Sequence, residues 1–128
     1  MVIANLLDTN AIIQLFDGNA EIEEALNRAD FVALSVISEF EYLSYGGLND
    51  ADIAEYGAFR VCTSVFNVPS DDQIFSQLVI SARREYGMKL PDAIIAATAR
   101  VNDLTVLTAD EHFKRLPPPW KVKFYGTR

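Results

Sequence analysis

The chain has 128 residues, half of them apolar, and a formal charge of −7. This length is typical of one domain with a sizeable core, and so apolar a composition argues against disorder. The single cysteine, Cys62, cannot form an internal disulfide, which indicates a reducing compartment. The N-terminal residues lack the features of a signal peptide, and no apolar run is long enough to span a membrane. We therefore expect one domain, residues 1–128, in the cytoplasm.

The acidic charge bears on the class of partner. Nonspecific binding to nucleic acid depends on lysines and arginines that neutralise phosphates, so an overall charge of −7 disfavours it. That objection weakens if part of the acidity belongs to a metal site, because bound divalent cations neutralise clustered carboxylates.

Short apolar segments alternate with helical ones along the whole chain. Strands are predicted at residues 2–7, 31–34, 66–68, 104–108 and 121–125. Helices are predicted at residues 9–16, 21–28 and 36–45, from 49–50 to about 61–64, from 70–72 to about 86, and at 91–101. The strands are too apolar to have a face in water, which favours a parallel sheet covered by helices on both sides. We therefore expect an α/β fold, a three-layer α/β/α sandwich with a central parallel sheet of four to five strands.

Two acidic residues follow predicted strands. Asp8 comes directly after the first strand, and Asp110 comes two residues after the strand that ends at Thr108. In open parallel sheets, ligands bind beyond the carboxyl ends of the strands, so both residues are candidates for a site there. The alternative is that each residue only caps the helix that follows it.

Glu39 lies in the helix predicted at residues 36–45. Val36, Phe40 and Leu43 form one apolar stripe at helical spacing, and Glu39 lies at its border. Glu41 points well away from this stripe and is interpreted as a solvated charge. Glu39 is therefore the candidate that reaches the sheet edge, unless it is only a first-turn acid that the helix dipole favours.

Asp92 is the second residue of the segment P-D-A-I-I-A-A-T-A-R, which is apolar or small on almost every side. Such a helix is predicted to be buried, and an ionised carboxylate in its first turn is costly without a partner. The N-terminus of the helix provides part of that compensation. One helix N-terminus would not compensate the charges of four acids that converge on one place.

Convergence of these acids would favour a metal site. Carboxylates close together raise one another's pKa values unless cations lie between them. Oxygen ligands, in a chain with one histidine and one cysteine, select Mg²⁺ or Mn²⁺ rather than zinc. A divalent pair held by acids is suited to hydrolysis of phosphodiester bonds.

Four motifs together resemble those of the PIN domain family, and specifically the VapC-like toxins of prokaryotic toxin–antitoxin pairs. They are L-L-D-T-N at residues 6–10, I-S-E-F at 37–40, L-P-D-A-I-I-A-A-T-A at 90–99 and L-T-A-D-E-H-F at 107–113. The resemblance implies an acidic quartet that holds Mg²⁺ or Mn²⁺, formed by Asp8, Glu39, Asp92 and Asp110. It also implies polar supporting roles for Thr9 and Thr108, and Glu111 is placed to share the role of Asp110.

The same resemblance implies endoribonuclease activity, a cognate antitoxin and a homodimer. Arg83, Arg84 and Lys89 flank Asp92 in sequence and are candidate RNA contacts, although they are also typical of solvated charges at a helix end. We expect the antitoxin to lay an apolar helix over residues 36–45 and 49–64. An arginine from it would reach Asp8, Glu39 and Asp92, because its planar guanidinium binds carboxylates with two hydrogen bonds.

Two other functions remain open at this point. The first is a PIN-like binding module that has no catalytic activity, which the presence of all four acids disfavours. The second is a receiver-type signalling domain, which also binds Mg²⁺ at the edge of a parallel sheet. The receiver reading requires an acidic pair near the first strand and an acceptor aspartate after the third, and the segment F-N-V-P at residues 66–69 offers none.

Overall fold

The computed structural model of the protein describes residues 2–126. Five strands form its sheet: β1 (Ala4–Leu7), β2 (Phe31–Ser35), β3 (Ser64–Phe66), β4 (Thr105–Thr108) and β5 (Val122–Phe124). The α-helices are α1 (Thr9–Phe16), α2 (Ala20–Arg28), α3 (Val36–Leu43), α4 (Asp50–Val61), α5 (Gln73–Tyr86) and α6 (Leu90–Val101). A short 3-10 helix, η1 (Glu111–Arg115), follows β4.

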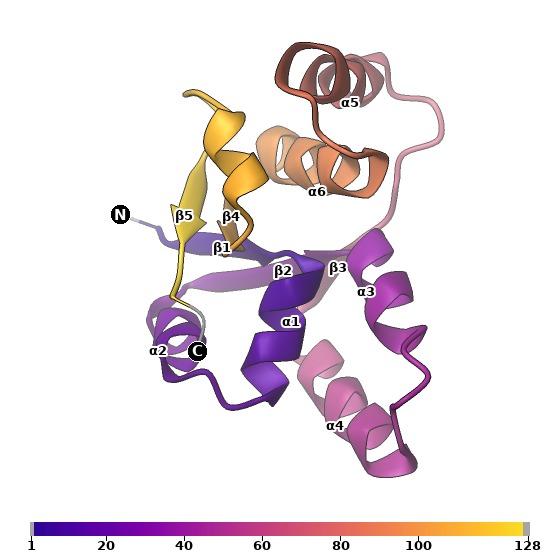
Figure 1. Cartoon of the computed structure of the whole chain (residues 1–128), viewed down its shortest axis with the longest axis vertical. Coiled ribbons are helices and arrows are strands. Elements are labelled where there is room, and N and C mark those ends of the chain that lie inside the picture. The colour runs from indigo at the N-terminus through magenta and orange to yellow at the C-terminus, as the bar shows by residue number, and fades with distance from the viewer. Residues whose placement is uncertain (1, 127–128) are drawn as a thin grey trace.

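All neighbouring strands of the sheet are parallel, in the order β3-β2-β1-β4-β5. Helices α5 and α6 lie on one side of this sheet, and α1, α2 and α4 lie on the other (Figure 1). The predicted three-layer α/β/α sandwich with a parallel sheet is therefore confirmed. The strand order also contradicts the receiver reading, because that fold has the order 2-1-3-4-5, whereas β1 here pairs with β2 and β4.

Successive residues of the central strands bury opposite faces of the sheet, as a period of two requires. Leu6 packs in the layer formed with α5 and α6, and its neighbour Leu7 packs in the layer formed with α1 and α2. Val106 and Leu107 divide in the same way. Burial of both faces explains why successive residues in the middle of these strands, such as Leu6 and Leu7, are both apolar.

The third strand lies two residues earlier in the structure than the sequence predicts. The third strand pairs through Ser64–Phe66 with Ala33–Ser35, rather than covering residues 66–68. Asn67 and Val68 are exposed, and Pro69 follows them without a backbone donor for a sheet. The predicted end of the fifth helix is confirmed, since Gly87 closes α5 with φ of 66°, a left-handed conformation that glycine adopts readily.

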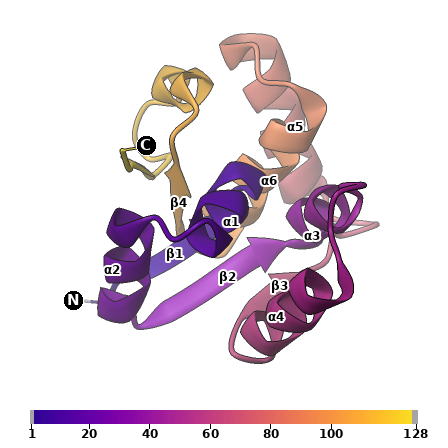
Figure 2. The ribbon, with the colours of Figure 1, turned by 60° about the horizontal axis from the view of Figure 1, so that its bottom comes forward.

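The strand order determines where a ligand site can form. The chain leaves β1 toward β2 on one side, whereas β4 lies on the other side of β1 (Figure 2). Strand β5 lies beyond β4. The carboxyl ends of β1 and β4 therefore flank the point at which the strand order reverses, where open parallel sheets bind their ligands. Within residues 2–126, no helix is both long enough and apolar enough to cross a membrane.

Candidate metal centre and catalytic site

A cleft of about 440 Å³ opens at the carboxyl ends of β1 and β4. Helices α1, α3 and α6 and the start of η1 contribute its walls. Four of the residues that line it are acidic, and the full set is Asp8, Thr9, Asn10, Glu41, Ser44, Tyr45, Asp92 and Asp110. Three of the four predicted acids, Asp8, Asp92 and Asp110, are thus brought together around one cleft.

Asp8 is the most buried of these acids, with 4% of its surface exposed. It caps α1, and its Oδ1 accepts a hydrogen bond of 2.8 Å from the Ala11 amide. Its Oδ2 accepts a hydrogen bond from the Thr108 hydroxyl. Burial raises the pKa of Asp8 to about 6; the bonds from Thr108 and Ala11 oppose that rise, and the charges of Asp92 and Asp110 add to it. Asp8 therefore caps a helix, and burial makes its ionised form energetically unfavourable.

Asp92 lies in the first turn of α6 and is half-buried. Burial raises its pKa, and the negative charges of Asp110 and Glu41 raise it further. His112 and Lys89 act in the opposite direction and lower the pKa of Asp92. These acids therefore influence one another electrostatically across the cleft.

Asp110 caps η1 and faces the same cleft. Its Oδ1 accepts a hydrogen bond of 2.9 Å from the His112 amide and lies 2.9 Å from His112 Nδ1. Its own amide donates to Thr108 Oγ1 at 3.0 Å. One buried hydroxyl, that of Thr108, thus holds both Asp8 and the backbone of Asp110, which gives Thr108 a positioning role.

The fourth acid that lines the cleft is Glu41, whereas the sequence predicts Glu39 at this position. Glu39 Oε1 accepts a hydrogen bond of 3.0 Å from the Tyr56 hydroxyl and pairs with Arg60 Nε, so its carboxylate faces α4. Glu41 instead lines the cleft, where its Oε1 accepts a hydrogen bond of 2.5 Å from Thr9 Oγ1. The predicted support from Thr9 therefore acts on Glu41.

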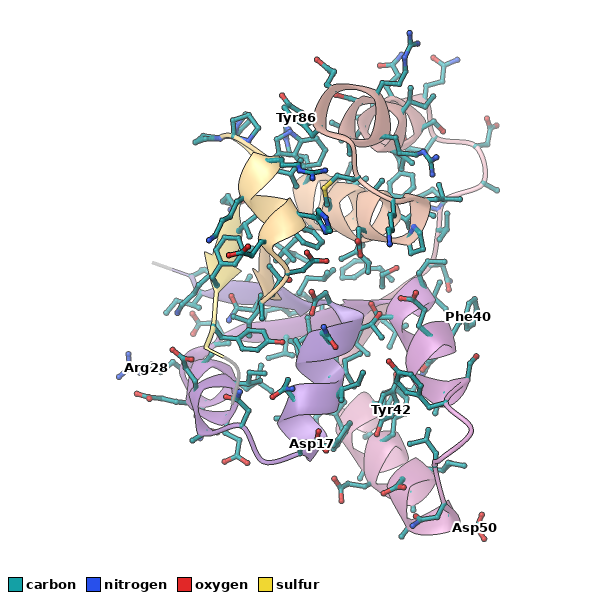
Figure 3. All side chains as sticks on the ribbon, in the orientation of Figure 1. Asp17, Arg28, Phe40, Tyr42, Asp50 and Tyr86 are labelled. Atoms are coloured by element: carbon teal, nitrogen blue, oxygen red, sulfur yellow. The ribbon has the colours of Figure 1, made fainter. Side chains whose placement is uncertain are left out.

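The orientation of α3 explains this correction. Its buried residues are Ser38 and Tyr42, whereas Phe40 and Leu43 are 58% and 43% exposed. Phe40 projects from the outer side of α3, and Tyr42 lies between α3, α1 and α4 (Figure 3). The apolar stripe that was expected to face the core faces outward instead. Because Ser38 and Tyr42 face the core, Glu41 lies on the side of α3 that lines the cleft.

The other predicted residues lie outside the cleft lining. Glu111 is exposed and pairs with Lys114 at 3.2 Å, so the structure does not bring it to the site with Asp110. Arg83 and Arg84 are exposed in the last turn of α5. Lys89 is also exposed, at the N-terminus of α6, and its charge lowers the pKa of Asp92. Of these three cations, Lys89 is therefore the one with an identified electrostatic effect on Asp92.

The acidic residues of the cleft suit a hard divalent cation by their donor chemistry. They offer carboxylate oxygens, and the other polar groups of the lining are the Asn10 amide and the hydroxyls of Thr9, Ser44 and Tyr45, with no thiol. Among residues 2–126, no three Asp, Glu, His or Cys side chains already lie close enough together to share one ion. Mg²⁺ is usually bound by one or two carboxylates and keeps several of its waters, so it does not need three such side chains.

Comparison with known proteins identifies a family. A family model described as the PIN domain matches residues 6–117. A toxin–antitoxin complex from Klebsiella pneumoniae contains a chain of 30% identity and TM-score 0.71, and the match covers 84% of this chain and 87% of that one. No curated protein sequence matches.

Two further solved structures share the fold at lower identity. VapBC2 from Rickettsia felis, bound to a DNA fragment from its promoter, matches at TM-score 0.79 and 16% identity over 97% of this chain and all of that one. DNA-bound VapBC from Salmonella typhimurium matches at TM-score 0.76 and 22% identity, covering 97% of this chain and 98% of that one.

Proposed function

The chain belongs to the PIN domain family, and on this premise we propose that it is a Mg²⁺- or Mn²⁺-dependent endoribonuclease, the toxin of a toxin–antitoxin pair. The observation that carries the proposal is the cleft at the sheet edge that Asp8, Glu41, Asp92 and Asp110 line together. A catalytically inert module has no need for four mutually repelling carboxylates in one cleft. The same cleft therefore disfavours the binding-module alternative.

In this mechanism, Asp8, Glu41, Asp92 and Asp110 would hold the metal. A divalent cation held there would supply the positive charge needed to activate water and to stabilise the leaving oxygen of the phosphodiester. Thr108 fixes the Asp8 carboxylate, and Thr9 fixes Glu41. His112 keeps Asp110 oriented at the rim of the cleft.

RNA contacts come from cations near this cleft. Lys89 is the first of these, since its charge acts on Asp92 at the start of α6. Arg83 and Arg84 extend the positive charge along the end of α5. These residues bind phosphate groups of the substrate, which partly offsets the acidity of the protein.

The test of this function is cleavage of a defined panel of single-stranded RNAs and matched DNAs by the purified protein with Mg²⁺ or Mn²⁺. Asp8→Asn, purified in the same way, controls for contaminating nucleases. The proposal requires endonucleolytic RNA products from the wild-type protein that Asp8→Asn does not form. Cleavage of DNA alone, or equal cleavage by both proteins, would contradict it.

The proposed antitoxin covers an exposed apolar face on α3, the loop after it and α4. This α3–α4 face consists of Phe40, Leu43, Tyr45, Ile53 and Val61, which are between 43% and 86% exposed. These exposed side chains lie on two helices that Glu39 joins through Tyr56 and Arg60, which makes the two helices a candidate interaction site. We propose that a small antitoxin lays an apolar helix on this face and sends an arginine to Asp8, Glu41 and Asp92, while a second copy of the chain forms a homodimer.

Co-expression with the neighbouring open reading frames tests the partner. A small protein encoded there should co-purify with the wild type and suppress its ribonuclease activity. Phe40→Glu should lose this partner, because it places a charge on the α3–α4 face. Ile74→Glu is a matched control on exposed α5 and should retain it. Equal recovery of the partner by both variants would place the antitoxin elsewhere.

A further inference from the structure

Tyr125, directly after β5, lies in the core beside the residues that position Asp8. It is 6% exposed and packs in the layer that contains Leu7, Ala11 and Leu107. Leu7 immediately precedes Asp8, and the Ala11 amide donates to Asp8 Oδ1. The tyrosine ring is therefore part of the same packed layer as the backbone on both sides of Asp8.

The hydroxyl of Tyr125 is buried without a protein partner. Its oxygen has no hydrogen bond to any group of residues 2–126. A hydroxyl removed from water without a replacement bond costs stability, and folded proteins pair such groups with protein or with internal water. A phenylalanine would fill the same space without that cost.

The backbone and the charge both connect Tyr125 with Asp8. The Tyr125 amide donates to the Thr108 carbonyl at 3.1 Å, and the Thr108 hydroxyl donates to Asp8 Oδ2. Burial raises the pKa of Tyr125, and the negative charge of Asp8 raises it further. Each oxygen of Asp8 accepts one hydrogen bond from the protein and can accept another.

We propose that Tyr125 is a positioning residue for Asp8, whose carboxylate accepts a hydrogen bond relayed from the Tyr125 hydroxyl by one internal water. The phenol donates to the water, and the water donates to the carboxylate. This relay fixes the orientation of Asp8 from the side of the core, opposite the open cleft. Its effect on metal binding rests on the proposed function, whereas its effect on the metal-free fold does not.

The stability test is a double-mutant cycle in EDTA at pH 8, where Asp8 is ionised. Tyr125→Phe should lower the Tm by about 3–5 °C, as loss of one buried hydrogen bond does in a domain of this size. In the Asp8→Asn background, the same change should cost less than half as much, because the charged acceptor is gone. Tyr42→Phe is the matched control: Tyr42 is also buried in this layer, but the charges that act on it are Asp52, Glu55 and Asp17. Its effect should be equal in both backgrounds.

Mn²⁺ binding, measured by electron paramagnetic resonance, provides the second readout. Tyr125→Phe should weaken binding about 10-fold, the usual loss when a partner of a metal ligand is removed, and Tyr42→Phe should leave it unchanged. A Tyr125→Phe protein as stable as the wild type, or equally destabilised in both backgrounds, would overturn the relay. If wild-type protein binds no Mn²⁺, the proposed function fails and the stability cycle still decides this inference.

Discussion

Thr9 Oγ1 donates a hydrogen bond to Glu41 Oε1 across 2.5 Å, and this contact joins the first turn of α1 to α3 at the carboxylate cleft. Glu39, two residues earlier, is turned to α4, where Tyr56 and Arg60 bind its carboxylate. Two glutamates on one short helix therefore have separate tasks. Glu41 belongs to the proposed metal site, and Glu39 joins α3 to α4.

Replacement of the two glutamates should separate activity from stability. Glu41→Gln should reduce kcat at least about 100-fold with little change in the free energy of unfolding, because it removes a ligand charge from an exposed side chain. Glu39→Gln should retain activity and lower the free energy of unfolding by about 1 kcal/mol, since it weakens a partly buried ion pair. RNA cleavage rates and urea unfolding measure the two effects. The reverse pattern, with activity lost only in Glu39→Gln, would return Glu39 to the site.

Stability of the metal-free protein should depend on pH through Asp8. Burial raises its pKa from 3.8 to about 6 in the folded state, so the folded protein binds an additional proton between these values. This group therefore contributes stability at low pH that is lost as the pH rises through 6, by up to about 3 kcal/mol.

The Asp8→Asn protein isolates this contribution. Urea unfolding in EDTA at pH 5 and pH 7 should show that the wild type gains stability relative to Asp8→Asn as the pH falls. Parallel changes in the two proteins would mean that Asp8 titrates normally.

Asp92→Asn should leave the metal-free protein at least as stable as the wild type. Burial and the charges of Asp110 and Glu41 raise the pKa of Asp92, so its ionised form is a net cost without metal. The increase in Tm that Mn²⁺ produces should shrink in this variant, because a ligand has been removed. Differential scanning fluorimetry with and without Mn²⁺ measures both effects. An unchanged Mn²⁺ shift would make Asp92 only a helix-end acid.

Lys89→Gln should raise KM for RNA and reduce the salt dependence of binding. Loss of one phosphate contact with single-stranded RNA lowers the slope of log K against log salt by about 0.7. Arg28→Gln is the control, because Arg28 is exposed on α2 and already pairs with Glu24. Equal slopes for Lys89→Gln and the wild type would exclude Lys89 from the RNA interface.

The fold was predictable because local patterns and tertiary packing agree. Leu6 and Leu7 are both apolar because both faces of β1 are buried, and Gly87 ends its helix where the sequence indicates. The third strand was displaced by two residues because its register depends on pairing with β2, which its own short sequence does not specify.

The positions of three of the four acids were predictable: Asp8 and Asp110 follow strands, and Asp92 lies in the first turn of a buried helix, whereas the glutamate on α3 was not predicted. Asp8 and Asp110 are positioned by the ends of β1 and β4, whose direction the strand pattern determines. For α3, apolar periodicity was misleading because Phe40 and Leu43 are exposed, whereas Ser38 and Tyr42 face the core. The sequence alone does not show whether an apolar stripe on a helix packs in the core or is exposed to a partner. The stripe of α3 was assumed to be buried, and Glu39 was therefore predicted at the site instead of Glu41.

The most direct test of the metal mechanism is the rate of RNA cleavage by protein that has been stripped with EDTA and then given increasing Mn²⁺. The carboxylate cleft predicts no cleavage in EDTA, a saturable return of activity with Mn²⁺, and no return in Glu41→Gln at the same concentrations. Full activity of the wild type in EDTA would contradict the metal mechanism.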